Sequence, residues 1–169
     1  FLEIPGAKEV GVEFYSLSKT YNMAGCRIGF AVGNPQILDA LGKIKSNIDY
    51  GVFKVIQEAG IAALEGPQEC VTQNALAYQK RRDVLVDGLE RIGWSMPKPH
   101  ASMFVWAPLP GGRTSSREFA FELLERTGIL VIPGVAFGPN GEGYVRIGLV
   151  QESEYLQEAV ERIENHYKF

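Results

Sequence analysis

The sequence predicts an α/β fold, in which short strands are interspersed with amphipathic helices. Apolar residues alternate with polar or small residues at 10–15 and at 28–32, which is the two-residue period of a strand. Between residues 34 and 92 the apolar residues recur every three or four positions instead, as on one face of a helix. After Gly93, segments with the strand period alternate along the chain with segments that have the helix period. Together these patterns favour an α/β architecture.

The composition is that of an ordinary folded domain. Of 169 residues, 46% are hydrophobic, and 17 basic against 20 acidic side chains give a net charge of −3, which excludes a disordered chain. The mildly acidic balance argues against a nucleic-acid partner, and no apolar run reaches the roughly 18 residues of a membrane span. Cys26 and Cys70 are not spaced as in metal-binding or redox motifs, and two cysteines make a poor disulfide framework. We therefore expect the protein to lie in a reducing compartment, the cytoplasm. The first residues, Phe1 to Pro5, show no pattern typical of a signal peptide, and because the sequence does not begin with methionine we expect it to be a piece of a longer protein.

The first part of the chain predicts two strands that flank a polar loop, followed by two helices. Asn34 and Pro35 are a typical helix start, because asparagine caps free N–H groups and proline fits the first helical position. The expected segments are strands at 10–15 and 28–32, the loop at 16–22, and helices at 34–46 and 52–63.

The remainder predicts one long helix and a second α/β region. An apolar stripe at 71–92 would give a helix about 35 Å long, which is enough to cross a domain. Ser115 and Glu118 form a capping box at the start of another helix. The other expected segments are strands at 103–107, 129–132 and 144–150, a turn-rich loop at 133–143, and a final helix with its apolar stripe at 156–167.

Candidate chemistry concentrates in the loop that joins the first two strands. His100 and His166 have no cysteine, histidine or carboxylate at ligand spacing, so we expect no metal site. The loop instead carries Lys19 on a scaffold of two strands, and a partly desolvated amine loses its proton and attacks a carbonyl more easily.

Three residues around Lys19 have the donors that a phosphate monoester needs. Ser16 and Ser18 supply hydroxyls, and Arg27 supplies a guanidinium on the polar side of the second strand. From the residue types alone, however, Lys19 is better explained as a solvated loop lysine and Arg27 as an edge-strand charge, because charged side chains are usually exposed.

The segment 16–29, SLSKTYNMAGCRIG, resembles the Schiff-base signature of class I and II aminotransferases, which are fold type I enzymes that use pyridoxal 5′-phosphate (PLP). The family pattern is S-x-S-K-x-x-x-x-x-G-x-R-x-G, and every specified position matches. Later segments that agree with the family in the same order are Asn34–Pro35, Ala101–Phe104, Pro133–Gly138 and Tyr144–Ile147. The resemblance therefore covers essentially the whole chain.

This resemblance implies a role for each candidate residue. Lys19 would form the Schiff base with PLP, and Ser16, Ser18 and Arg27 would bind the cofactor phosphate. Arg146 would bind the substrate α-carboxylate, for which a planar fork of donors is suited. The implied reaction moves an amino group between an amino acid and a 2-oxo acid, in an enzyme of the aspartate or LL-diaminopimelate type.

The implied fold is the C-terminal part of a fold type I transferase, a three-layer α/β fragment. Residues 1–66 would be the remnant of the large PLP-binding domain and its mostly parallel sheet, 67–92 a bridging helix, and 93–169 the small domain. Such enzymes share their active sites across a homodimer, and we expect the loop at 47–51 to lie at that contact. Cys26, where many members carry tryptophan, is expected to be a small buried filler.

Part of the expected active site is missing from the sequence. Family members bind the pyridine nitrogen with an aspartate that precedes the lysine, and without that carboxylate the ring is a weaker electron sink. The four aspartates all follow Lys19; they are Asp39, Asp49, Asp83 and Asp87. We therefore expect the isolated chain to be inactive.

Two alternatives remain open from the sequence. One is a PLP-dependent C–S or cyclopropane-forming lyase on the same fold, which differs in the steps after deprotonation of the substrate. The other is the PLP-binding effector domain of a transcription regulator, which would bind the cofactor through Lys19 and signal rather than turn over.

Overall fold

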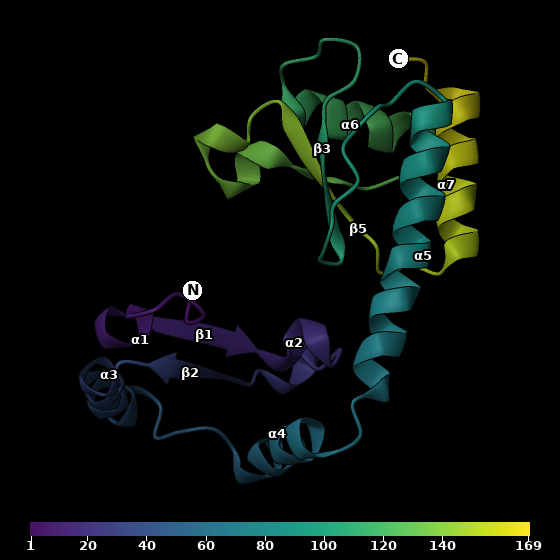
Figure 1. Ribbon diagram of the computed structural model, residues 1–169. Coiled ribbons are helices and arrows are strands. Elements are labelled where there is room, and N and C mark those ends of the chain that lie inside the picture. The colour runs from purple at the N-terminus through teal and green to yellow at the C-terminus, as the bar shows by residue number, and fades with distance from the viewer. The chain divides into compact units, whose positions relative to one another are not determined.

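The computed structural model describes residues 1–169, which divide into one unit of residues 1–75 and another of 76–169. Helix α5 (Glu69–Arg91) begins in the first unit and ends in the second (Figure 1). No helix is both long enough and apolar enough to cross a membrane.

The first unit is built on an antiparallel pair of strands. Strand β1 (Val12–Ser16) pairs with β2 (Gly29–Gly33), and the rings of Tyr15 and Phe30 stack on this ribbon with centroids 5.3 Å apart. Gly29 is required in the pairing, because a Cβ there would lie 2.4 Å from the carbonyl oxygen of Tyr15. The helical segments of this unit are α1 (Ala7–Val10), α2 (Leu17–Thr20), the 3₁₀ turn η1 (Ala24–Cys26), α3 (Pro35–Ile48) and α4 (Lys54–Glu65).

The helix starts predicted from capping residues are confirmed. The Asn34 side chain accepts hydrogen bonds from the backbone N–H groups of Gln36 and Ile37 at 2.9 and 3.1 Å, and α3 begins at Pro35. In the second unit, Ser115 accepts from the N–H of Glu118 at 3.3 Å, at the start of α6 (Ser116–Thr127). Each cap satisfies N–H groups that have no partner within the helix.

Several local expectations are wrong for identifiable reasons. Residue 10 lies in helix α1 rather than in the first strand, because the turn that follows Gly6, which has φ +80°, runs on to Val10. The strand expected at 129–132 is reduced to β4 (Ile132–Pro133), which makes only two pairs with β5, Ile132 with Arg146 and Pro133 with Val145. The loop expected at 16–22 contains the helical turn α2, which the Ser16 side chain caps.

Strands β1 and β2 pair antiparallel, an arrangement that suits their short connection. Residues 17–28 connect the two strands and contain only short helical turns. A parallel pair needs a crossover, usually a complete helix, whereas antiparallel strands accept a short connection. The first unit therefore contributes an antiparallel ribbon and shows no parallel pair.

The second unit has a three-stranded antiparallel sheet in the order β3-β5-β4. Strand β3 (Phe104–Pro108) pairs with the central strand β5 (Tyr144–Gly148), and Trp106 lies opposite Arg146. The other segments of this unit are α6, α7 (Ser153–His166) and the 3₁₀ turns η2 (Gly134–Phe137) and η3 (Pro139–Gly141).

The hydrophobic core lies within the second unit. Helices α5 and α7 run side by side and approach so closely that a Cβ on Gly88 would lie 2.8 Å from Cγ2 of Val160 (Figure 1). The largest fully buried side chains come from α5, α6, α7, the sheet and the segments that directly follow α5 and β5; they include Leu89, Trp94, Val105, Phe119, Leu123, Val145, Leu149 and Val160. In the first unit only Ala7 and Leu17 are buried hydrophobic residues.

A buried tyrosine near the end of α7 gives the stability of the second unit a pH dependence. Tyr167 is 2% exposed, and its hydroxyl donates to Oε2 of Glu122 at 2.7 Å. Burial and this hydrogen bond raise the pKa of Tyr167 to about 12, and the same bond lowers the pKa of Glu122. The unfolded state, with a tyrosine pKa of about 10, therefore loses this proton first, and stability falls as the pH rises from about 10 to about 12.

Tyr167→Phe is expected to lower the free energy of unfolding by about 1–2 kcal/mol at pH 7, because it removes a hydrogen bond to a charged acceptor. The variant should also lose the fall in stability between about pH 10 and 12. Urea unfolding monitored at pH 7, 9 and 11 measures both effects. Tyr155→Phe, on the exposed part of α7, is the matched control, and an equal loss in the control would contradict the assignment.

Candidate functional site

The lysine segment is a capped helical turn at the end of β1. Ser16 is the last residue of the strand, and its Oγ accepts a hydrogen bond from the N–H of Ser18 at 3.2 Å. Leu17 is 2% exposed and donates its N–H to the carbonyl oxygen of Ile28 at 3.2 Å, which fixes the turn to the entry of β2. Lys19 projects from this anchored turn and is exposed within the first unit. The sequence thus folds so that two hydroxyls and one amine share a single turn.

Arg27 lies at the end of η1, two residues before β2 begins, and not within the second strand as expected. Ser16 pairs with Gly29 across the ribbon, so Arg27 lies just before the residue that faces Ser16. Arg27 has φ +51°, the left-handed conformation that non-glycine residues rarely adopt. Its Nη1 donates to the carbonyl oxygen of Ala24 at 2.9 Å, and its side chain is exposed. Such backbone outliers cluster at functional sites, where surrounding structure holds them in place.

The start of α5 braces the lysine turn through contacts that the sequence did not reveal. The Tyr21 hydroxyl donates to Oε1 of Gln68 at 2.8 Å, and Nδ2 of Asn22 donates to Oδ1 of Asn74 at 3.0 Å. Asn74 also donates to the carbonyl oxygen of Thr20 at 3.4 Å. About fifty residues separate the partners in sequence, so no local pattern could have indicated these bonds.

Arg146 lies in the second unit, on the outer face of β5. Val145 and Leu149 point into the core, so the alternation predicted for this strand is confirmed. The guanidinium carbon of Arg146 lies 4.4 Å from the ring centroid of Phe104 and 4.4 Å from that of Phe137. Ser16, Ser18, Lys19 and Arg27 belong to the first unit.

Cys26 differs from its expected environment. It is half-buried in η1 rather than buried, and Cys70 is exposed. The 3₁₀ turn places Cys26 directly before the left-handed residue Arg27, where the chain turns at the surface. No group of three or more His, Cys, Asp or Glu side chains is arranged to bind a metal ion.

Comparison with known proteins decides the family. The family model for aminotransferase class I and II matches residues 5–163. The chain belongs to the class I and II aminotransferase family. The family inferred from the segment 16–29 is thereby confirmed, and with it the use of PLP, on which these aminotransferases depend.

Among similar aminotransferases are two curated bacterial proteins named LL-diaminopimelate aminotransferase. The one from Moorella thermoacetica is 52% identical over 163 residues, and the one from Syntrophobacter fumaroxidans is 55% identical over 163 residues. Each alignment covers 96% of this chain and 42% of the relative. The chain thus spans about two fifths of the length of these relatives.

Solved aminotransferase-family structures share the fold. Substrate-bound BacF from Bacillus subtilis matches with a TM-score of 0.92 and 41% identity, over 97% of this chain and 42% of that one. A probable N-succinyldiaminopimelate aminotransferase from Thermus thermophilus matches with a TM-score of 0.89 and 41% identity, over 97% and 44%. The structure is therefore a fragment of the fold type I aminotransferase architecture.

The donor set of the first unit fits the cofactor. A phosphate dianion is bound by hydroxyl and guanidinium donors, and Ser16, Ser18 and Arg27 supply both kinds. A Cβ added at Gly25, the residue before η1 ends, would meet no atom within 4 Å, so this side of the turn is open. Lys19 contributes a primary amine on the same turn as the two serines.

Proposed function

We propose that the complete protein containing this chain is a PLP-dependent aminotransferase that moves an amino group between an amino acid and a 2-oxo acid. One observation carries this proposal: the segment 16–29 has the whole lysine signature of the family and folds as a capped turn between paired strands. The family match over residues 5–163 supports it along nearly the whole chain.

In this proposal each residue has a distinct task. Ser16, Ser18 and Arg27 bind the phosphate, and the rigid turn fixes the position of Lys19. Lys19 would hold the cofactor covalently, and its Nζ would accept the proton that leaves the substrate Cα. Bound PLP supplies an electron sink for the negative charge that develops at Cα. Arg146 binds the α-carboxylate and so orients the Cα–H bond.

Substrate, assembly and location form the finer part of the proposal. The curated relatives named LL-diaminopimelate aminotransferase support an amino acid of that kind as amino donor. We place the protein in the cytoplasm as a homodimer, with the loop at 47–51 in the contact. Ile48 is 73% exposed and Tyr50 is 93% exposed, which leaves apolar surface available for a partner.

The proposal predicts that the complete protein transfers the amino group of LL-diaminopimelate to 2-oxoglutarate, and that the isolated chain of residues 1–169 does not. The residues that hold the pyridine nitrogen would come from the remaining length of the protein, since the relatives are more than twice as long. Coupled detection of glutamate measures both preparations. Release of ammonia or a thiol without glutamate formation would favour the lyase alternative. Cofactor binding with no turnover of any amino acid would favour the regulator.

A further inference from the structure

The side chain of Arg146 is held by aromatic rings instead of carboxylates. Its guanidinium carbon is 4.4 Å from the rings of Phe104 on β3 and Phe137 on η2, well within the distance of about 6 Å at which cation–π attraction acts. The Arg146 guanidinium forms no ion pair and no hydrogen bond within the chain, and its only recorded side-chain contacts are these two rings. We call Phe104 and Phe137 the aromatic clamp.

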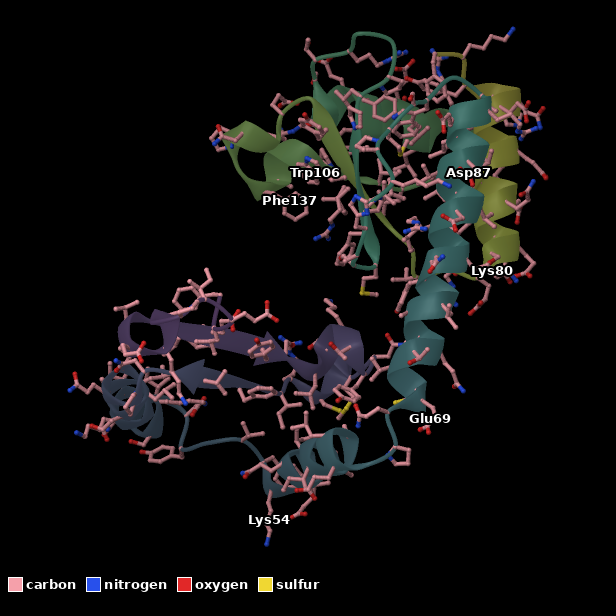
Figure 2. The ribbon with its side chains drawn as sticks, viewed as in Figure 1. Lys54, Glu69, Lys80, Asp87, Trp106 and Phe137 are labelled. Carbon is pink, nitrogen blue, oxygen red and sulfur yellow. The ribbon has the colours of Figure 1, made fainter.

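A second pair of rings supports the clamp. Trp106 lies opposite Arg146 in the β3–β5 register and meets Phe137 edge-on, with centroids 5.7 Å apart and an interplanar angle of 71°. Trp106 also stacks on Tyr144 with centroids 5.6 Å apart. Figure 2 shows Trp106 and Phe137 close together in the second unit. Phe137 is therefore fixed by a neighbour even though it is 50% exposed.

The kind of contact matters for what Arg146 can bind. A carboxylate partner would neutralise the guanidinium charge and occupy its N–H donors. An aromatic ring attracts the cation through its π face and accepts no conventional hydrogen bond, so the five N–H donors keep their capacity for a ligand. Two rings on different elements also limit the rotamers of the long arginine side chain. Because the side chain is already ordered, less conformational entropy is lost when a ligand binds, and the affinity is higher.

We propose that Phe104 and Phe137 are positioning residues that pre-order Arg146 for the substrate carboxylate. The inference rests on the proposed function of Arg146 as the carboxylate ligand. It assigns to the clamp an effect on the binding of carboxylate-bearing substrates, and no direct contact with the reacting atoms. Loss of one ring should therefore raise KM and leave kcat nearly unchanged.

The test uses the complete holoenzyme and measures steady-state kinetics with its amino acid substrate. Phe104→Leu and Phe137→Leu are each expected to raise KM about 3- to 10-fold, which corresponds to the usual strength of one cation–π contact, with kcat within about twofold. Phe104→Tyr and Phe137→Tyr, which keep the π face, should restore KM. Phe121→Leu removes an exposed phenylalanine from α6 in the same unit and should change neither parameter.

A substrate without a carboxylate separates positioning from a merely structural role. The single-turnover half-reaction with the corresponding primary amine, which lacks the α-carboxylate, should be equally slow in the wild type and in both leucine variants. A parallel loss with amino acid and amine would overturn the clamp. Phe137 is the more informative position, because its exposure makes misfolding of the variant less of a concern.

Arg146→Ala distinguishes failure of the clamp from failure of the underlying function. If Arg146→Ala raises the KM for the amino acid but neither leucine variant does, the clamp is refuted and the carboxylate role stands. If Arg146→Ala leaves KM unchanged, the role proposed for Arg146 is itself wrong.

Discussion

Replacing Lys19 with alanine in the complete protein should lower kcat for transamination by roughly 10³-fold or more. The substitution removes both the group that holds the cofactor and the base that takes the Cα proton, and general base catalysis alone contributes about 10²- to 10⁴-fold. The turn itself should survive, because its cap and its buried anchor come from Ser16 and Leu17. Single-turnover absorbance measurements with the amino acid substrate follow the loss directly.

Lys43→Ala is the matched control for this experiment. Lys43 lies on α3 in the same unit and forms an exposed ion pair with Asp39 four residues earlier, a kind of pair that contributes little to stability. Its removal should leave kcat unchanged. Retention of wild-type turnover by Lys19→Ala, or an equal loss in Lys43→Ala, would show that another group performs the lysine chemistry.

In the isolated chain of residues 1–169, backbone amides of the first unit are expected to exchange with solvent about a hundredfold or more faster than those of the second. The reason is the distribution of buried apolar surface. The first unit buries only Ala7 and Leu17 among its hydrophobic residues, and Phe14 on β1 is 72% exposed. The second unit has a continuous core built from its helices and sheet. Local opening costs least where few apolar contacts must break.

Hydrogen exchange with mass spectrometry compares the β1–β2 pair with the β3–β5 pair, which are both antiparallel ladders of five paired residues. Because both pairs are antiparallel and of equal length, a difference in their amide exchange rates cannot come from the type of strand pairing. In the complete protein the β1–β2 amides should become protected, because the rest of the protein would cover their apolar side chains. Equal protection of both ladders in the isolated chain would contradict the account.

Local rules predicted most elements because their signals are short in sequence. Asn34 and Ser115 predicted the starts of two helices, because both residue types cap free N–H groups. The apolar stripe at 71–92 predicted the long helix α5, and both of its ends agree to within two residues. The helical turn at Leu17 was missed because four residues contain no periodicity, although a serine just before it is itself a capping signal. Strand pairing was the least predictable feature, since it depends on connections and neighbours.

Only part of the candidate site could be predicted from the sequence. Ser16, Ser18, Lys19 and Arg27 lie within twelve residues, and a family signature can identify such a cluster. The brace from Gln68 and Asn74 joins residues distant in sequence, and the contact of Phe137 with Arg146 requires η2 to fold back onto β5. Such contacts follow from tertiary packing, which no local pattern encodes.

The whole proposed function depends on Lys19 as the residue that holds the cofactor. The most direct measurement is reduction of the PLP-loaded complete protein with borohydride, followed by proteolysis and mass spectrometry of the peptides. We expect one phosphopyridoxyl group, on Lys19, and no label on other lysines such as Lys43 or Lys54. A label on a different lysine, or no covalent label in a protein that transaminates, would contradict this expectation.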